Sequence, residues 1–97
     1  MQQEFAAELW RARSGAGAGV VFARVPADVS AELRDVPRPR ACFGSVRVTV
    51  TLGGSRWSTS VFPESSECYV LPVKKAVRAA ERVDVGDVVR IRIETVG

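Results

Sequence analysis

The residues best suited to chemistry form a basic stripe in the second half of the chain. Lys74, Arg78 and Arg82 are spaced four residues apart, and Lys75 adjoins them. On a helix this spacing aligns the side chains along one face, where cations bind phosphate groups or an acidic partner. The alternative is an ordinary solvated helix face whose field is reduced by Glu81 and nearby acidic residues.

More arginines are scattered through the chain. Arg11 and Arg13 precede a glycine-rich loop, and Arg56 follows a Gly-Gly pair. A net charge of +3 permits nucleic-acid binding without requiring it. Trp57 and Trp10 are suited to line a ligand pocket at a barrel mouth, although core packing is the alternative. The candidate partner-binding residues are Lys74, Lys75, Arg78, Arg82, Arg11, Arg13 and Trp57.

Histidine is absent from the sequence. Its absence excludes Ser-His and Cys-His dyads and removes the commonest general base near neutral pH. Catalysis by Lys, Asp or Glu stays open, but no spacing supports it. We therefore predict that the protein is not an enzyme and has no catalytic residues.

Two cysteines, Cys42 and Cys68, fall in strand-like segments. We predict free, buried thiols, with a disulfide or redox chemistry as alternatives. Two distant cysteines without histidine make a mononuclear metal site unfavourable, and no cofactor is predicted. The loop Ser14–Gly19 lacks the Gly-Lys-Ser/Thr ending of a phosphate cradle and precedes a strand; we predict a hairpin loop.

Targeting signals are not evident. No apolar run approaches the roughly 20 residues that span a bilayer, and Met1–Glu4 lacks the basic start of a signal peptide. A cytoplasmic protein without a membrane partner is the expectation.

Hydrophobic periodicity predicts the elements that position these residues. Valines at 46, 48 and 50 alternate with polar residues, which indicates a strand with one buried face. The Gly53-Gly54 pair predicts a tight hairpin turn, and Gly86 is suited to a positive φ. The predicted strands are Glu4–Arg13, Val20–Val25, Phe43–Leu52, Ser55–Phe62, Cys68–Leu71 and Val88–Thr95. The predicted helices are Ala27–Arg34, opened by Pro26, and Val73–Arg82, opened by Pro72, with Val73, Ala76, Val77 and Ala80 as its apolar stripe.

The predicted order is strand-strand-helix-strand, written twice, at approximately 4–52 and 55–96. Ninety-seven residues make one domain, and half of it is too small to bury its own apolar face. We therefore predict a mainly β fold: a small six-stranded barrel with two short helices at its ends or rims. Because both halves lie in one chain, we expect a monomer.

Two resemblances support this fold. The stretch Leu71–Arg78, followed by Val83–Val89, resembles the swapped-hairpin motif of AbrB/MazE-type transcription factors, which carry a proline-started helix, a Gly-Asp turn and a strand. The wider resemblance is to the bacterial domain-of-unknown-function family DUF1905. It is carried by Phe5–Trp10, Val25–Val29, Phe43–Val46, Trp57–Val61 and Tyr69–Asp87. It implies a double-split β-barrel, the AbrB-like architecture within one chain, and brings no catalytic residues.

The function that we predict from the sequence is a non-enzymatic binding or interaction module. Its partner is a protein or a small molecule. The alternative is a nucleic-acid-binding regulator that uses the basic face of the second helix.

Overall fold

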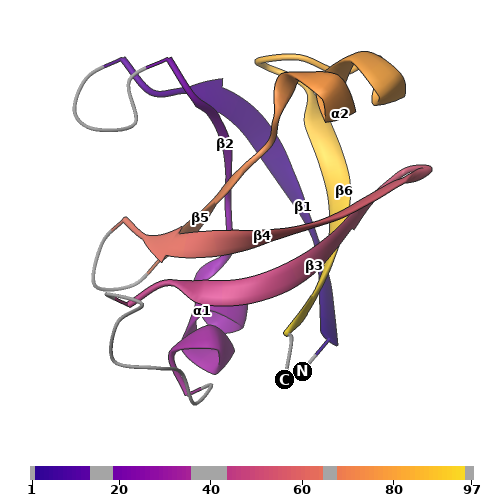
Figure 1. Ribbon diagram of the computed structural model, residues 1–97. Helices are drawn as coiled ribbons and strands as arrows, with labels where there is room; N and C mark the ends of the chain where they lie inside the picture. Colours follow the sequence, from indigo (N-terminus) through magenta and orange to yellow (C-terminus); the bar gives the residue numbers. More distant parts are fainter. Residues whose placement is uncertain (1, 14–18, 36–43, 65–67, 96–97) are drawn as a thin grey trace.

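The computed structural model describes residues 2–13, 19–35, 44–64 and 68–95, which form six strands and two helices (Figure 1). In chain order they are β1 (Gln2–Arg11), β2 (Val21–Arg24), α1 (Ala27–Arg34), β3 (Val46–Leu52), β4 (Ser55–Pro63), β5 (Tyr69–Pro72), α2 (Lys75–Glu81) and β6 (Val88–Thr95). The mainly β fold class is therefore confirmed. Most of the predicted glycine loop, together with Cys42 and Phe43, lies outside the described residues.

The six strands close into an antiparallel barrel in the order β1-β2-β5-β4-β3-β6. Exchanging β1 with β4, β2 with β5 and β3 with β6 leaves this order unchanged. Two strand-strand-helix-strand copies packed symmetrically against each other would give a strand order with this property. The duplication itself stays a prediction. Closure leaves no free sheet edge among these strands.

Alternation along the strands sorts the side chains between the barrel interior and the solvent. On β3, Val46, Val48 and Val50 are buried, and the residues between them are exposed or half-buried. On β6, Ile91 and Ile93 are completely buried, whereas Arg90 and Arg92 are exposed. The periodicity therefore identified the inward faces correctly. Contacts between these faces make one continuous core that fills the barrel.

The helices lie at opposite ends of the barrel (Figure 1). Helix α1 has the predicted bounds, follows Pro26 directly, and buries Val29 and Leu33 in the core. Helix α2 is shorter than predicted. Pro72 is the last residue of β5 and so does not open the helix, which begins at Lys75.

The predicted apolar stripe of α2 is wrong at two of its four positions. Ala76 and Ala80 are exposed, whereas Val77 is buried and Val73 is buried just before the helix. Val77 is the one buried residue of this seven-residue helix. Alanine periodicity is a weak signal because a methyl group gains little from burial.

Ser30 on α1 is the only polar residue among those described as fully buried in the core. Its hydroxyl donates to the carbonyl oxygen of Val25 at 3.1 Å and accepts the Tyr69 N–H at 3.0 Å. The Val25 N–H also donates to the Tyr69 carbonyl at 2.9 Å. One hydroxyl therefore joins α1 to the end of β2 and the start of β5, where the two halves of the chain meet.

Candidate functional site

A surface pocket of about 450 Å³ opens between α2, the end of β1 and the turn that follows α2. We call it the α2 pocket. Four cationic side chains and one carboxylate line it, with only two small apolar residues between them. Its lining residues are Arg11, Lys75, Arg78, Ala79, Arg82, Val83 and Asp84.

Backbone hydrogen bonds fix the turn that forms one wall of the α2 pocket. The Gly86 N–H donates to the Leu9 carbonyl at 2.8 Å, and the Leu9 N–H donates to the Asp87 carbonyl at 2.9 Å. The Asp87 carboxylate accepts the Asp84 N–H at 2.8 Å. Gly86 has a φ of +94°, as predicted from the sequence. The end of β1, which carries Arg11, is thereby held against the turn that carries Asp84.

Arg82 ends α2 in a left-handed conformation, with φ 56° and ψ 44°. The Arg82 N–H points to the Ala79 carbonyl at 3.4 Å, and the Val83 N–H donates to the Arg78 carbonyl at 3.0 Å. This is the Schellman arrangement, in which glycine usually occupies the left-handed position. A left-handed non-glycine residue costs about 1–2 kcal/mol. The chain therefore places an arginine at the pocket where glycine would be more stable.

Arg78 is the most buried cation of the α2 pocket. Its side chain is only 16% exposed, and its ion pair with Asp84 is long, at 3.6 Å between Nη1 and Oδ1. Its buried Nε has no hydrogen-bond partner among the described residues. Removing a guanidinium from water without full compensation is unfavourable. Arg78 is therefore a cation whose hydrogen-bonding capacity is only partly used.

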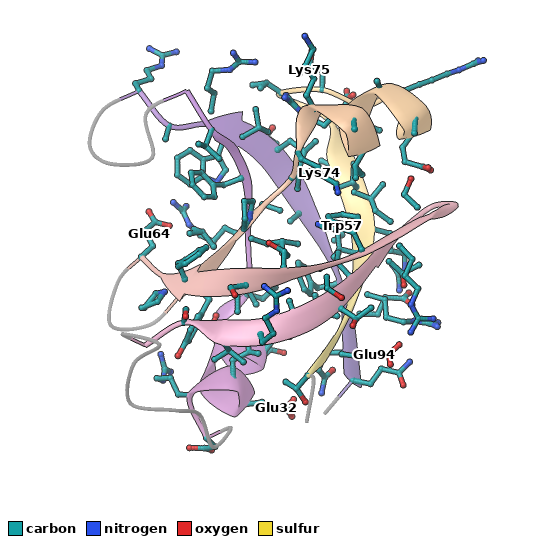
Figure 2. All side chains as sticks on the ribbon, in the orientation of Figure 1. Glu32, Trp57, Glu64, Lys74, Lys75 and Glu94 are labelled. Atoms are coloured by element: carbon teal, nitrogen blue, oxygen red, sulfur yellow. The ribbon has the colours of Figure 1, made fainter. Side chains whose placement is uncertain are left out.

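The other three cations of the pocket are also available. Within the described part of the chain, Arg11, Lys75 and Arg82 form no ion pair. Figure 2 shows Lys75 where α2 begins, at the top of the view. The α2 pocket thus concentrates positive charge that the neighbouring acidic side chains do not neutralise.

Glu81, on α2, holds the helix to the β3–β4 hairpin. The Gly54 N–H donates to its Oε1 at 3.1 Å, and the Ser55 hydroxyl donates to its Oε2 at 2.7 Å. Because both oxygens of Glu81 accept hydrogen bonds from the hairpin, Glu81 neutralises less of the positive charge of the pocket than the sequence indicated. It instead positions the helix that carries Lys75 and Arg78 and that Arg82 caps.

Gly53→Ala is expected to break this attachment. Gly53 has a φ of +60°, and an added Cβ would lie 1.8 Å from Glu81 Oε1, so the carboxylate must move away. Gly86→Ala, at a φ of +94° with nothing within 4 Å, is a comparison that carries backbone strain without a steric contact. We expect Gly53→Ala to cost about 1 kcal/mol more in urea unfolding than the same substitution made in a Glu81→Ala background, where the contact with the carboxylate is gone. An equal cost in the two backgrounds would contradict the attachment.

The structure brings four of the seven predicted partner-binding residues into the α2 pocket and leaves three outside it. Lys74 is exposed at the N-cap of α2 and does not line the pocket. Arg13 is exposed two residues beyond the end of β1. Trp57 is partly buried, packs against the core, and lies below α2 in Figure 2. Core packing was the alternative interpretation of Trp57, and the structure supports that alternative.

Asp84 and Val83 are pocket residues that the sequence pattern did not single out as binding residues. Both residues directly follow the basic stripe in the sequence, where the nearby acidic residues were considered only as charges that reduce its field. The role of a carboxylate beside arginines can be assigned only when the fold shows which side chains line the same pocket.

A second, shallower pocket of about 280 Å³ lies on the outer face of β1, β3 and β6. Its cations are already paired, because Glu4 accepts hydrogen bonds from Arg90 and Arg92. The hydrogen bond from Arg90 lowers the pKa of the Glu4 carboxyl below its usual value. An internal carboxylate therefore occupies the place that an anionic ligand would need.

An aromatic cluster covers the outer face of β1 and β2. The rings of Trp10 and Phe22 lie 5.4 Å apart between centroids, and the Arg24 guanidinium stacks 5.4 Å from the Trp10 ring. Arg24 also forms a double hydrogen bond with Glu64, which raises the pKa of Arg24. Arg24 therefore has its partners within the cluster, whereas the buried Trp10 Nε1 has no hydrogen-bond partner among the described residues.

Two further observations describe the part of the chain covered by the structure. No three Cys, Asp or Glu side chains there come together as a metal-ligand cluster. None of its helices has the length and apolar character needed to cross a bilayer.

Comparison with known proteins gives one family match. The family model described as "Domain of unknown function (DUF1905)" matches residues 5–93. No curated protein matches the chain at a significant level. The matched region begins within β1 and ends within β6, so it spans the whole barrel and both helices. The chain therefore belongs to the DUF1905 family.

Proposed function

We propose that the protein is a non-catalytic binding module that takes a compact anionic ligand in the α2 pocket. The observation that carries the proposal is the composition of that pocket: four cations face one carboxylate around about 450 Å³ of space. Small-molecule sites commonly have volumes of roughly 300–1,000 Å³. Cations that converge on a partly enclosed space attract anions more strongly than the same charges spread over a surface.

The geometry favours a small anion over a nucleic-acid duplex. The predicted alternative needed Lys74, Arg78 and Arg82 as an open stripe along one helix face. Lys74 and Arg82 are instead the N-cap and C-cap residues of α2, and Arg78 is largely buried. A seven-residue helix with one exposed cation of its own, Lys75, and an exposed cation at each cap offers few phosphate contacts, and duplex affinity depends on their number.

Three of the four cations that line the pocket are arginines, and this composition supports the non-catalytic part of the proposal. Among the residues that line the pocket, Asp84 is the one carboxylate, and its Oδ1 already accepts the Val85 N–H at 2.7 Å. The sequence supplies no histidine to act beside it. Arginines and a lysine bind and orient anions well, but arginine does not lose its proton at neutral pH.

Calorimetric titration with inorganic pyrophosphate at low ionic strength tests the proposal. We expect saturable binding with one site per chain that weakens as salt is added. Lys75→Glu should reduce the affinity by about 10-fold or more. Arg47→Glu is the matched control, because Arg47 is exposed on the outside of β3, away from the α2 pocket, and changes the net charge equally.

Equal losses in Lys75→Glu and Arg47→Glu would contradict the α2 pocket as the binding site. A duplex oligonucleotide in the same titration separates the alternative function. Binding to the duplex without binding to pyrophosphate would replace the small-anion proposal with a nucleic-acid one.

Arg82→Gly is expected to change stability and affinity in opposite directions. Glycine accepts the left-handed conformation of this position, so we expect the free energy of unfolding to rise by about 0.5–1 kcal/mol. The loss of a guanidinium should lower the pyrophosphate affinity by about 3- to 10-fold. Arg82→Ala is the control, because it removes the cation but keeps the backbone strain. If Arg82→Gly bound pyrophosphate as tightly as the wild type, Arg82 would have no part in binding.

A further inference from the structure

We infer that the ligand of the α2 pocket is a phosphorylated, hydroxyl-bearing small molecule, such as a sugar or polyol phosphate. This inference rests on the proposed anion-binding function and adds the chemical class of the ligand. Three features of the pocket lead to it: its four cations, the exposed carboxylate of Asp84, and the scarcity of apolar surface.

The cations of the pocket come from two elements, β1 and α2. Arg11 comes from the end of β1, Lys75 from the start of α2, and Arg82 from the end of α2. Four cations that line one space suit a phosphate, whose oxygens are arranged as a tetrahedron and carry about two negative charges as a monoester. A carboxylate is planar and carries one charge, so it pairs best with a single guanidinium fork.

Arg78 is the residue that would bind the phosphate group of the ligand most closely. Its ion pair with Asp84 is too long for a good hydrogen bond, and its Nε has no partner among the described residues. A rotation of the side chain that brings the buried Nε to the pocket would let a phosphate oxygen supply the missing acceptor. Arginine favours such multi-point contacts with phosphate.

Asp84 adds a negatively charged hydrogen-bond acceptor to a pocket that is otherwise lined by cations. Its side chain is 74% exposed, and its Oδ1 both accepts the Val85 N–H and makes the long ion pair with Arg78. A carboxylate repels a phosphate but is a strong acceptor for hydroxyl groups. A ligand that carries hydroxyls a short distance from its phosphate therefore satisfies both the cations and Asp84.

The apolar part of the pocket is too small for a nucleobase platform. Ala79 and Val83 are the only apolar residues that line the pocket, and no aromatic ring is among its lining residues. Base recognition usually relies on stacking against aromatic side chains. The pocket thus fits the polar body of a polyol better than the flat body of a nucleotide.

Four probes in one calorimetric series test the inference: methyl phosphate, acetate, ribose 5-phosphate and ribose. Methyl phosphate and ribose 5-phosphate share the phosphate monoester and differ in the hydroxyls. We expect ribose 5-phosphate to bind about 10-fold more tightly than methyl phosphate, because hydrogen bonds to a charged acceptor are the strong ones. Acetate should bind about 10-fold more weakly than methyl phosphate, and ribose alone should not bind measurably.

Asp84→Ala is the variant that isolates the hydroxyl contact. It should raise the affinity for methyl phosphate and bring the ratio of the two phosphates close to one. Asp84→Asn keeps an acceptor oxygen for the Val85 N–H and should give an intermediate ratio, which shows that a loosened turn is not the cause. Thermal unfolding of both variants checks that they fold.

The outcomes separate this inference from the proposed function. If methyl phosphate and pyrophosphate bind but ribose 5-phosphate binds no better, the hydroxyl part is wrong and the anion site stands. A ratio unchanged in Asp84→Ala also overturns the role of Asp84. Acetate binding as tightly as methyl phosphate overturns the phosphate class. If no anion binds at low ionic strength, the proposed function itself is wrong.

Discussion

Arg78→Met is expected to lower the pyrophosphate affinity by about 10- to 100-fold, which corresponds to the loss of about 1.5–3 kcal/mol of hydrogen bonding to a charged group. Methionine keeps the length of the aliphatic stem and removes the guanidinium. Because Arg78 is 84% covered and only weakly paired, we expect the fold to keep or gain stability when this poorly compensated charge is removed. Calorimetric titration and urea unfolding of the same sample measure both effects.

Two further variants make the Arg78 prediction specific. Arg78→Lys keeps the positive charge but not the planar fork, and should recover only part of the affinity. Arg47→Met removes a cation from the outer face of β3, outside the pocket, and should leave the affinity within about 3-fold of the wild type. An Arg78→Met protein that folds and binds pyrophosphate normally would show that the largely buried guanidinium does not contact the ligand.

Ser30→Ala is expected to destabilise the protein by about 1–3 kcal/mol. The substitution removes the hydroxyl that accepts the Tyr69 N–H and donates to the Val25 carbonyl. Ser30 is completely buried, so no water replaces the lost acceptor without opening the core. The penalty therefore comes mainly from a buried backbone N–H left without a partner.

Urea unfolding compares this variant with Ser58→Ala, which removes an exposed hydroxyl from the outside of β4 and should change stability by less than about 0.5 kcal/mol. Similar small changes at both positions would mean that the Ser30 hydroxyl does not hold α1 to the strands. Anion affinity should be unaffected by Ser30→Ala, because α1 and α2 lie at opposite ends of the barrel (Figure 1) and the pocket is lined by residues of α2.

Most of the fold could be predicted from the sequence because its signals are physical and local. Alternation on β3 and β6 identified the buried faces, and Gly53-Gly54 closed the β3–β4 hairpin as expected. Pro26 marked the start of α1 correctly. The prediction that Pro72 opens α2 was wrong because a proline also fits the end of a strand. Two further residues follow Pro72 and take the chain across the barrel end before α2 begins.

The candidate site could be predicted only in part. Lys75, Arg78 and Arg82 were identified by their charge and spacing, and Arg11 by its charge alone. Their convergence depends on contacts between distant segments, above all the hydrogen bonds that join Leu9 to the turn after α2. A regular helix over 73–82 would have included Lys74 in the binding surface. The short helix leaves Lys74 outside and turns Arg82 into a left-handed cap.

The measurement that tests the central claim most directly is the location of anion binding by NMR. A titration with inorganic pyrophosphate, followed by backbone amide shifts in the folded protein, reports every described segment at once. We expect the largest saturable shifts at Arg11 and over residues 75–84, with little change at β3, β4 and α1. Shifts centred on the outer face around Arg90 and Arg92, or spread evenly over all arginines, would contradict the α2 pocket as the ligand site.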